Sequence, residues 1–437
     1  MSLPRVLLVG YTVHPDQGSE PAHGWGWAQA LAKRGHTVEL LAVPYSGNKE
    51  ALERHIAAMG AVGERIHVHF VPSPEPRPYR MFPSHLQYLS VEHSRYTRWQ
   101  YAALAYARAK LDGAVDIVHH VSFSSLQGGC ALVDWGLPTI FGPVGGAQVA
   151  PWKMRRYFGS GWPMEVVRTL VWARLLGYSP LALRTVRRSS VVVVENSDTF
   201  RAASRRGAQR LAVNVGAAVP SVFLTDLGPG GHTTRGESLI WVGKLEPRKA
   251  PEIAIRAMVR VRELRPAAKL TIAGEGPMRE SLERLVVGLG LADCVRLIGR
   301  IPRPDLLHLL DTSDVMLFTS LRDTFGAQNP EAWARGVPTV YLDHHGVHDH
   351  SPEGGSIGIA LDHADRVPQL VGEAAARILN DPPLRKRMSE AARKHAESFT
   401  WDAFAESAQA WYADALDAGQ SSERAVARLR RYLASRT

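Results

Sequence analysis

The sequence predicts an α/β protein made of two Rossmann-like domains, each with a doubly wound parallel sheet. Short apolar runs, typical of buried strands, alternate with segments of helical spacing along almost the whole chain. The alternation occurs twice, and the glycine-containing segment Thr225–Gly236 separates the two copies as the best candidate linker. The length of 437 residues also fits two domains of about 200 residues each.

The first copy begins with the apolar run Arg5–Tyr11, which predicts a buried strand, and continues with a helix over Ala22–Arg34 that ends at Gly35. Residues 73–92 contain several prolines without a clear period and are predicted as a loop. The remaining strands of this half are expected at Thr37–Pro44, Ile66–Pro72, Asp116–Val121, Thr139–Pro143, Val191–Glu195 and Leu211–Val215, with helices at Arg95–Leu111 and Ser124–Asp134.

The second copy repeats the same rhythm. Strands are expected at Ser238–Gly243, Lys269–Gly274, Val295–Gly299, Asp314–Thr319 and Thr339–Asp343, with helices near 251–264, 277–289, 304–310 and 329–335. Three more helices follow near 366–380, 383–396 and 402–417. The predicted boundaries are 1–224 for the first domain, 225–236 for the linker, 237–400 for the second domain and 401–437 for the C-terminal helices.

Composition narrows the classes of protein only partly. The formal net charge of +10 favours an anionic ligand, such as a nucleotide, a phosphorylated compound, an anionic membrane or nucleic acid. Arginine-rich segments occur, but no nucleic-acid-binding motif accompanies them, so no nucleic-acid partner is expected. With two cysteines and no apolar run near the roughly 20 residues of a membrane helix, a cytoplasmic protein without a disulfide framework is expected.

The strongest motif runs from Ser320 to Pro338. A strand is followed by a glycine-containing loop and by a helix that begins near Asn329, and a helix N-terminus offers free N–H groups to a diphosphate. Asp323 and Glu331 lie on either side of this loop. Carboxylates repel a phosphate, but they accept hydrogen bonds from the hydroxyl groups of a sugar and a ribose. An ordinary strand–turn–helix with an acidic first turn remains the alternative.

This segment resembles the signature of the retaining glycosyltransferases of family 4, which have the GT-B fold: an acidic residue, a glycine-containing loop, a glutamate eight residues after the first, and a Gly-x-Pro end, here Gly336 to Pro338. The resemblance implies that Glu331 holds the ribose diol and that Asp323 contacts the donor sugar. It also implies a donor loop made of Thr324, Phe325, Gly326, Ala327 and Gln328.

Other segments of the second half resemble the same family and occur in the family's order. The turn from Gly243 to Lys249 resembles the one that presents two basic residues, here Lys244 and Lys249, to the diphosphate. Two cations there would stabilise the departing diphosphate, a role that a metal has elsewhere. Gly274, Glu275 and Gly276 resemble the family's glycine-rich turn, and Arg300 with Ile301 resembles the border of the nucleobase site.

In the first half, the resemblance implies an acceptor domain that also approaches the donor. Gly18 and Ser19 resemble a glycine loop that faces the donor phosphate, with Glu20 beside the acceptor; a long loop with a capping serine is the alternative. His119 or His120 would contact the donor sugar or the transition state, and the sequence leaves open which of them does so or whether either is a core histidine. The glycine-rich strand end Gly145–Gly146 is a further acceptor candidate, and residues 401–437 would return to the first domain.

The expected function is therefore metal-independent, retaining transfer of a sugar from a nucleoside diphosphate, UDP favoured and GDP possible, to a small-molecule or glycan acceptor, without a cofactor. A nucleotide-sugar epimerase, a phosphorylase and a non-catalytic nucleotide-binding protein remain alternatives. The first strand lacks the Gly-x-Gly-x-x-Gly of a dinucleotide oxidoreductase, and the chain has no Asp-x-Asp metal clamp. The cluster from Asp343 to His350 is the one candidate metal site and is not favoured.

The basic segment Met164–Arg188 could dock on anionic lipid through its apolar side or pack that side against a sheet. Gly177 and Pro180 interrupt the helical pattern, and the apolar side is broad, so packing in the core is predicted. At most weak peripheral membrane contact follows.

Overall fold

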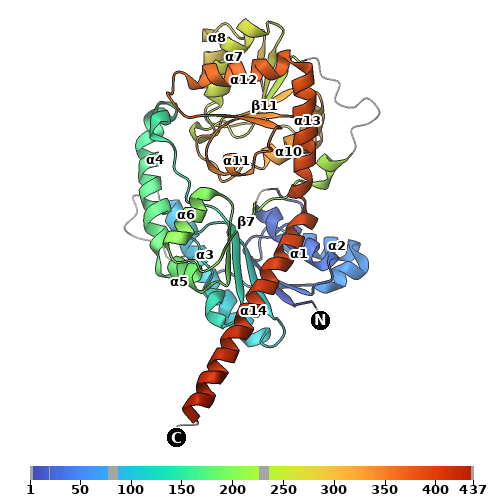
Figure 1. Cartoon of the computed structure of the whole chain (residues 1–437), viewed down its shortest axis with the longest axis vertical. Helices are drawn as coiled ribbons and strands as arrows, with labels where there is room; N and C mark the ends of the chain where they lie inside the picture. Colours follow the sequence, from blue (N-terminus) through green and yellow to red (C-terminus); the bar gives the residue numbers. More distant parts are fainter. Residues whose placement is uncertain (1–2, 19, 77–86, 226–235, 435–437) are drawn as a thin grey trace. The chain divides into compact units, whose positions relative to one another are not determined.

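The computed structural model describes residues 3–18, 20–76, 87–225 and 236–434, so Ser19 and most of the predicted linker lie outside the described residues (Figure 1). The chain divides into two compact units. Unit 1 contains Met1–Ala147, Trp172–Ala217 and Trp401–Thr437, and unit 2 contains Gln148–Val171 and Ala218–Thr400. The segment Gln148–Val171, which lies inside the first predicted domain along the sequence, thus belongs to unit 2 in the structure.

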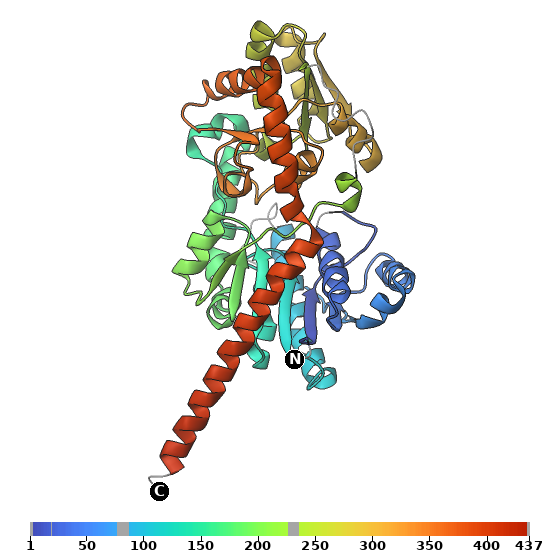
Figure 2. The ribbon, with the colours of Figure 1, turned by 45° about the vertical axis from the view of Figure 1, so that its right-hand side comes forward.

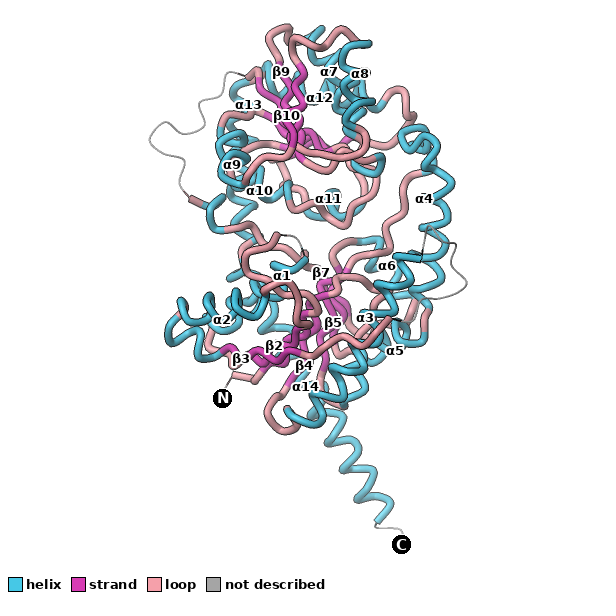
Figure 3. Tube along the Cα trace, turned by 180° about the vertical axis from the view of Figure 1, so that it is seen from behind, coloured by secondary structure: helices cyan, strands magenta, loops and turns pink. Residues whose placement is uncertain are grey.

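Unit 1 is built on a seven-stranded sheet with the strand order β3-β2-β1-β4-β5-β6-β7, and every pair of neighbours is parallel. The strands are β1 (Val6–Gly10), β2 (Val38–Ala42), β3 (Ile66–Phe70), β4 (Ile117–Ser122), β5 (Thr139–Val144), β6 (Val191–Val194) and β7 (Leu211–Val213). The helices are α1 (Glu20–Lys33), α2 (Asn48–Ala58), α3 (Gln87–Lys110), α5 (Pro180–Arg188), α6 (Ser197–Arg205) and α14 (Trp401–Ala434). Figure 3 shows these helices around the strands.

Both faces of this sheet are covered, which explains why its strands are continuous apolar runs rather than alternating ones. On one face, Leu7, Val118 and Phe141 pack with Trp99 of α3. On the other face, the C-terminal helix α14 contacts α1 and β5, as Figure 2 shows.

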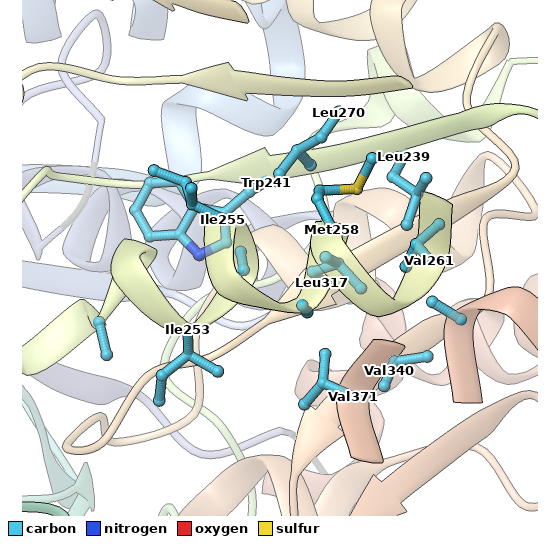
Figure 4. Packing of buried hydrophobic residues seen from close by; sticks show 14 of the residues in the cluster. Leu239, Trp241, Ile253, Ile255, Met258, Val261, Leu270, Leu317, Val340 and Val371 are labelled. Carbon is cyan, nitrogen blue, oxygen red and sulfur yellow. The ribbon is translucent and has the colours of Figure 1, made fainter. Parts of the chain in front are cut away.

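Unit 2 has a six-stranded parallel sheet with the order β10-β9-β8-β11-β12-β13. The strands are β8 (Ser238–Val242), β9 (Lys269–Ala273), β10 (Val295–Gly299), β11 (Val315–Phe318), β12 (Thr339–Leu342) and β13 (Ser356–Ile359). The helices are α4 (Trp162–Arg168), α7 (Pro251–Leu264), α8 (Arg279–Gly288), α9 (Arg303–Asp311), α10 (Gln328–Ala334), α11 (His345–His350), α12 (Val367–Asn380) and α13 (Pro382–Ala396). Figure 4 shows part of the apolar core of this unit, to which Trp241, Met258 and Val371 belong.

The two-sheet α/β architecture predicted from the sequence is confirmed, whereas some of its elements differ. The helix predicted at Ser124–Asp134 is wrong, because this stretch is a series of turns followed by a short 3-10 helix at Ala131–Trp135. The reason is Gly129, whose φ of 65° breaks a helix. Helix α2 and strand β13 were not predicted, and the loop expected at 73–92 gives way to α3 at Gln87.

The core packing predicted for Met164–Arg188 is confirmed only in part. Leu181 and Val186 of α5 are buried, but the side chains of Leu170 and Leu175 are 55% and 66% exposed. The earlier part of the segment instead buries Glu165 and leaves Met164 and Val167 exposed as well. Among the helices of the described part of the chain, none combines the length and the apolar character needed to cross a membrane.

Candidate active site

The predicted donor residues of unit 2 gather at one edge of its sheet. Strands β10, β9, β8 and β11 are adjacent and parallel, so the turns that follow them lie next to one another. These turns carry the predicted donor residues, and the backbone N–H of Gly274 donates to the carbonyl oxygen of Gly299 over 2.8 Å. The carboxyl ends of parallel strands are the usual ligand position in such sheets.

Two glycines allow the turns after β8 and β9 to approach closely. A side chain at Gly274 would collide with the carbonyl group of Gly243, and one at Gly276 would meet the carbonyl oxygen of Leu245 at 2.5 Å. The Leu245 N–H donates to the carbonyl of Glu275 over 2.9 Å. The glycines that resemble a phosphate-binding turn therefore also have a structural reason to be there.

The predicted donor side chains on these turns differ in exposure. Lys244 and Arg300 are exposed, whereas Ile301 is half-buried. Glu275 accepts a hydrogen bond from Arg279 over 2.7 Å. Lys244 is thus open to a ligand from solvent, while Glu275 is occupied by its own neighbour.

Lys249 and Asp323 form an ion pair between the turn after β8 and the loop after β11. Both are largely buried, with side-chain exposures of 11% and 18%. Burial alone would raise the pKa of Asp323, but the charges of Lys249 and Arg248 hold it below its usual value. The Thr324 N–H also donates to this carboxylate, over 3.1 Å. Asp323 is therefore ionised at neutral pH.

The loop between β11 and α10 is fixed from inside unit 2. Phe325 stacks on Phe399 with ring centroids 5.4 Å apart. Gly326 has a φ of 93°, and a side chain there would meet the ring of Phe318 at 2.6 Å. Asn329, which the sequence analysis did not select, donates from Nδ2 to the carbonyls of Phe325 and Gly326, each over 3.1 Å.

Two further predicted donor residues, Ala327 and Gln328, lie at the start of α10, and its N-cap makes no side-chain hydrogen bond. Gln328 donates to the carbonyl of Val242 over 3.4 Å, which ties α10 to the end of β8. Ala327 is the N-cap and provides no side-chain cap. Helix α10 is only seven residues long. The first amides of this short helix are therefore left without a side-chain acceptor.

The carboxylate of Glu331 has a raised pKa. Its side chain is half-buried, and within the described parts of the chain its carboxylate makes no hydrogen bond. Burial raises its pKa to about 7, although the charge of Arg303 opposes the rise. A half-buried carboxylate that makes no hydrogen bond to the described residues is suited to accept hydrogen bonds from ligand hydroxyl groups.

The two histidines of β4 point to opposite faces of the sheet, and both are fully buried. His119 lies between Tyr412 of α14, 2.7 Å from Nδ1 to Oη, and the carbonyl of Gly142, 3.0 Å from Nε2. His120 approaches the hydroxyl of Tyr96 with Nε2 at 2.7 Å. Burial lowers the pKa of His119 to about 4 and that of His120 to about 3. The geometry favours the core alternative for both rings, and contact with a donor stays a prediction.

The acceptor candidates of unit 1 are linked at the carboxyl ends of β4 and β5. The Ser124 N–H donates to the carboxylate of Glu20 over 2.6 Å, and the carbonyl of Ser124 accepts from the Gly145 N–H over 3.1 Å. Burial raises the pKa of Glu20. Gly146 accepts a hydrogen bond from Gln127 over 2.8 Å, and Gly18 is exposed. Glu20, Gly145 and Gly146 thus form one connected rim.

Sequence reasoning missed several residues that contact the candidate site. Arg248 donates to the carbonyl of Arg322 over 3.4 Å, and Arg322 pairs with Glu165 of α4 over 2.7 Å. No short motif could have found Glu165, because the pair depends on the folding of a distant segment onto unit 2. In unit 1, buried Glu195 accepts from the Gly216 N–H over 2.8 Å beside the ring of His23.

The candidate metal cluster does not converge. Asp343 pairs with His348 over 2.6 Å, and His344 contacts the carbonyl of Ser320 over 2.9 Å. Within the residues that the structure describes, no group of three or more histidine, cysteine, aspartate or glutamate side chains could hold a metal ion. Metal-independent transfer stays a prediction.

Comparison with known proteins gives one family. Residues 229–395 match the family described as "Glycosyl transferases group 1". A D-inositol 3-phosphate glycosyltransferase from Corynebacterium diphtheriae is 31% identical over 197 residues, which are 43% of this chain and 45% of that protein. The protein of the same name from Thermobifida fusca is 28% identical over 328 residues, which are 70% of this chain and 71% of that protein. The chain thus matches less than half the length of the first relative.

One solved structure has a fold similar to that of this protein over nearly the whole chain. The crystal structure of Anabaena HepE in complex with UDP is 15% identical with a TM-score of 0.61, and the match covers 92% of this chain and 98% of that chain. At this identity the likeness concerns the fold alone. Residues 229–395 are therefore similar to the group 1 glycosyltransferases, and the two Rossmann-like units have the GT-B fold.

Proposed function

We propose that the chain is a retaining glycosyltransferase that moves a sugar from a nucleoside-diphosphate sugar to a small-molecule or glycan acceptor without a metal ion. UDP is favoured as the nucleotide, and GDP is possible. The observation that carries the proposal is the buried Lys249–Asp323 pair, which joins the turn after β8 to the loop after β11 at one edge of the unit 2 sheet; Glu331 lies in the helix α10 that follows this loop.

The reaction breaks the bond between the anomeric carbon of the sugar and a diphosphate oxygen, and it forms a bond from that carbon to an acceptor hydroxyl oxygen. The acceptor proton leaves with the diphosphate. Lys249 and Lys244 would stabilise the charge that grows on the diphosphate as the first bond breaks. Glu331 would accept hydrogen bonds from the ribose hydroxyls, and Asp323 from those of the sugar.

Unit 1 would bind the acceptor. Its rim of Glu20, Gly145 and Gly146 stands at the carboxyl ends of β4 and β5, where parallel sheets usually bind ligands. His119 and His120 would stabilise this rim through packing, because both are buried residues of β4, the strand that leads to it. The relatives named after D-inositol 3-phosphate support an acceptor with hydroxyl groups.

Thermal shift with a panel of nucleotide sugars tests the donor class. A UDP-sugar at a hundredfold its dissociation constant should add about 2.7 kcal/mol to the stability of the full chain. The released nucleotide is then measured by liquid chromatography with candidate acceptors. Turnover of the donor without an acceptor to an epimer would identify an epimerase, and binding without any turnover would identify a non-catalytic nucleotide-binding protein.

Activity in the presence of a chelator tests whether transfer requires a metal ion. Transfer should continue in excess chelator, because Lys244 and Lys249 supply positive charge next to the diphosphate. Loss of activity that Mg²⁺ or Mn²⁺ restores would overturn metal independence. Determining the anomeric configuration of the first-formed product tests retention.

A further inference from the structure

The segment between β5 and α5 is built into the core of unit 2. Met154, Tyr157 and Phe158 belong to the same buried cluster as Leu245 and Ile253. The hydroxyl of Tyr157 also donates to the carbonyl of Ala364 over 2.6 Å. The 3-10 helix Trp152–Gly161 contacts the turn Pro247–Lys249, which carries one half of the Lys249–Asp323 pair. Helix α4 follows directly, so its position relative to the donor turns is fixed by buried packing.

From α4, Glu165 reaches the residue that precedes Asp323. Its side chain is only 7% exposed, and one carboxylate oxygen lies 2.7 Å from Nε of Arg322. Arg168, one turn along the same helix, pairs with this carboxylate over 3.0 Å. One buried carboxylate thus neutralises part of two guanidinium charges.

Arg322 is also held through its main chain. The Leu321 and Arg322 N–H groups donate to the carbonyl of Arg248 over 2.8 and 3.3 Å, and Arg248 donates back to the carbonyl of Arg322 over 3.4 Å. The main chain is therefore fixed up to Asp323, while the direction of the Arg322 side chain depends on Glu165.

The charge balance around Asp323 makes this direction matter. Burial and the charge of Arg168 lower the pKa of Arg322 to about 10, so the guanidinium is still protonated at neutral pH. Without Glu165, the guanidinium of Arg322, whose side chain is 22% exposed, would lose its ion-pair partner while its residue directly precedes Asp323 in the chain. The nearest remaining carboxylate along the chain is Asp323 itself. An unpaired buried charge is costly, so Arg322 would turn toward it.

We propose that Glu165 is a positioning residue of the donor site, which holds Arg322 away from Asp323 and so keeps the Asp323 carboxylate available to the donor sugar. This inference rests on the proposed function, in which Asp323 contacts the sugar. Glu165 itself touches no substrate and acts through Arg322.

The test compares wild type with three variants of the full chain in steady-state transfer from the UDP-sugar found by the screen. Glu165→Gln keeps the shape and removes the charge, and it should lower kcat/KM for the donor by about 10- to 100-fold. The affinity for UDP, which lacks the sugar, should stay within about threefold. Arg322→Gln in the Glu165→Gln background removes the stray cation and should restore most of the lost kcat/KM. Arg168→Gln, which shares the carboxylate but lies outside the donor loop, is the matched control and should stay within about twofold of wild type.

The outcomes separate the two proposals. If the wild-type chain neither binds UDP nor consumes a UDP-sugar, the proposed function fails, and the role of Glu165 falls with it. If wild type is active and Glu165→Gln has wild-type kcat/KM, only the positioning role is overturned. A double variant no better than Glu165→Gln, or an equal loss of UDP affinity, would show that Glu165 supports the fold rather than the position of the Arg322 side chain.

Discussion

Lys249 and Asp323 are joined in an ion pair that links the turn after β8 to the loop after β11. Each side chain is less than one-fifth exposed, at 11% and 18%, so each charge depends on the other for compensation. Under the proposed function, Lys249 contacts the diphosphate of the donor and Asp323 contacts its sugar, so donor binding separates the pair. Without a donor, the two charges therefore compensate each other.

The first prediction concerns the stability of this pair. Removing one charge leaves the other buried and unpaired, so Lys249→Met and Asp323→Asn should each cost about 3 kcal/mol of unfolding free energy. The double variant should cost less than either single one, because neither charge remains. Urea unfolding of the four proteins measures this, and costs that simply add would contradict an energetic coupling between the two residues.

The second prediction concerns the pH dependence of Glu331. Its pKa of about 7 lies above the usual 4.5, so the folded chain holds this proton more tightly than the unfolded chain. The contribution of Glu331 to stability is therefore present below pH 4.5 and is lost as the pH rises toward 7. Glu331→Gln should gain about 1–3 kcal/mol over wild type across this window and keep that gain above it.

The same variant should bind the donor worse, by one to three decades in kcat/KM, because a neutral amide is a weaker acceptor for two ribose hydroxyls. Parallel measurement of urea unfolding and of donor kinetics at pH 6 and 8 checks both effects. A variant with wild-type kcat/KM would remove Glu331 from the donor site, and equal stabilities at pH 8 would contradict its raised pKa.

The third prediction concerns His119 and His120. With pKa values of about 4 and 3, both rings should remain neutral throughout pH 5–8. Protonation favours the unfolded chain, whose histidines bind protons near pH 6.5, so their contribution to stability falls as the pH drops from 6.5 toward 4. NMR of ring carbons, assigned with His119→Gln and His120→Gln, measures this. A ring that titrates near pH 6.5 would contradict its burial.

The fourth prediction compares two glycines of unit 2. Gly326→Ala would force a side chain against Phe318 at a φ of 93°, so it should destabilise the chain by about 1–3 kcal/mol and disturb the donor loop. Gly288→Ala, at the end of α8 with no atom within 4 Å of the added group, is the matched control and should be neutral or slightly stabilising. Thermal unfolding distinguishes them, and equal melting temperatures would show that the loop adapts.

The sequence predicted the fold well where the physics is local. Buried parallel strands such as Val6–Gly10 and Val315–Phe318 are apolar runs, and short-range patterns identify them. Lys249 and Asp323 were each predicted to follow a strand, and the structure shows that these strands, β8 and β11, are parallel neighbours. Sequence reasoning failed at Ser124–Asp134, where Gly129 outweighs the apolar pattern.

Long-range contacts account for the rest. Nothing near Glu165 indicates that its carboxylate is buried against Arg322, since the two are far apart in the chain. Similarly, the hydrogen bond between Tyr412 and His119 requires the C-terminal helix to cover the first sheet. Whether a polar side chain is buried depends on its partner in the tertiary structure, and the hydrophobic periodicity of the sequence does not identify that partner.

Calorimetric titration of UDP into the full chain is the decisive experiment for a nucleotide site at the unit 2 sheet edge. Wild type should bind one UDP per chain, and Glu331→Gln and Lys249→Met should each weaken that binding by at least tenfold. Arg284→Gln, a change at an exposed arginine of α8, should bind as wild type does. No binding of UDP or GDP to wild type, or equal affinities in all four proteins, would contradict a nucleotide-sugar site at this edge of the sheet.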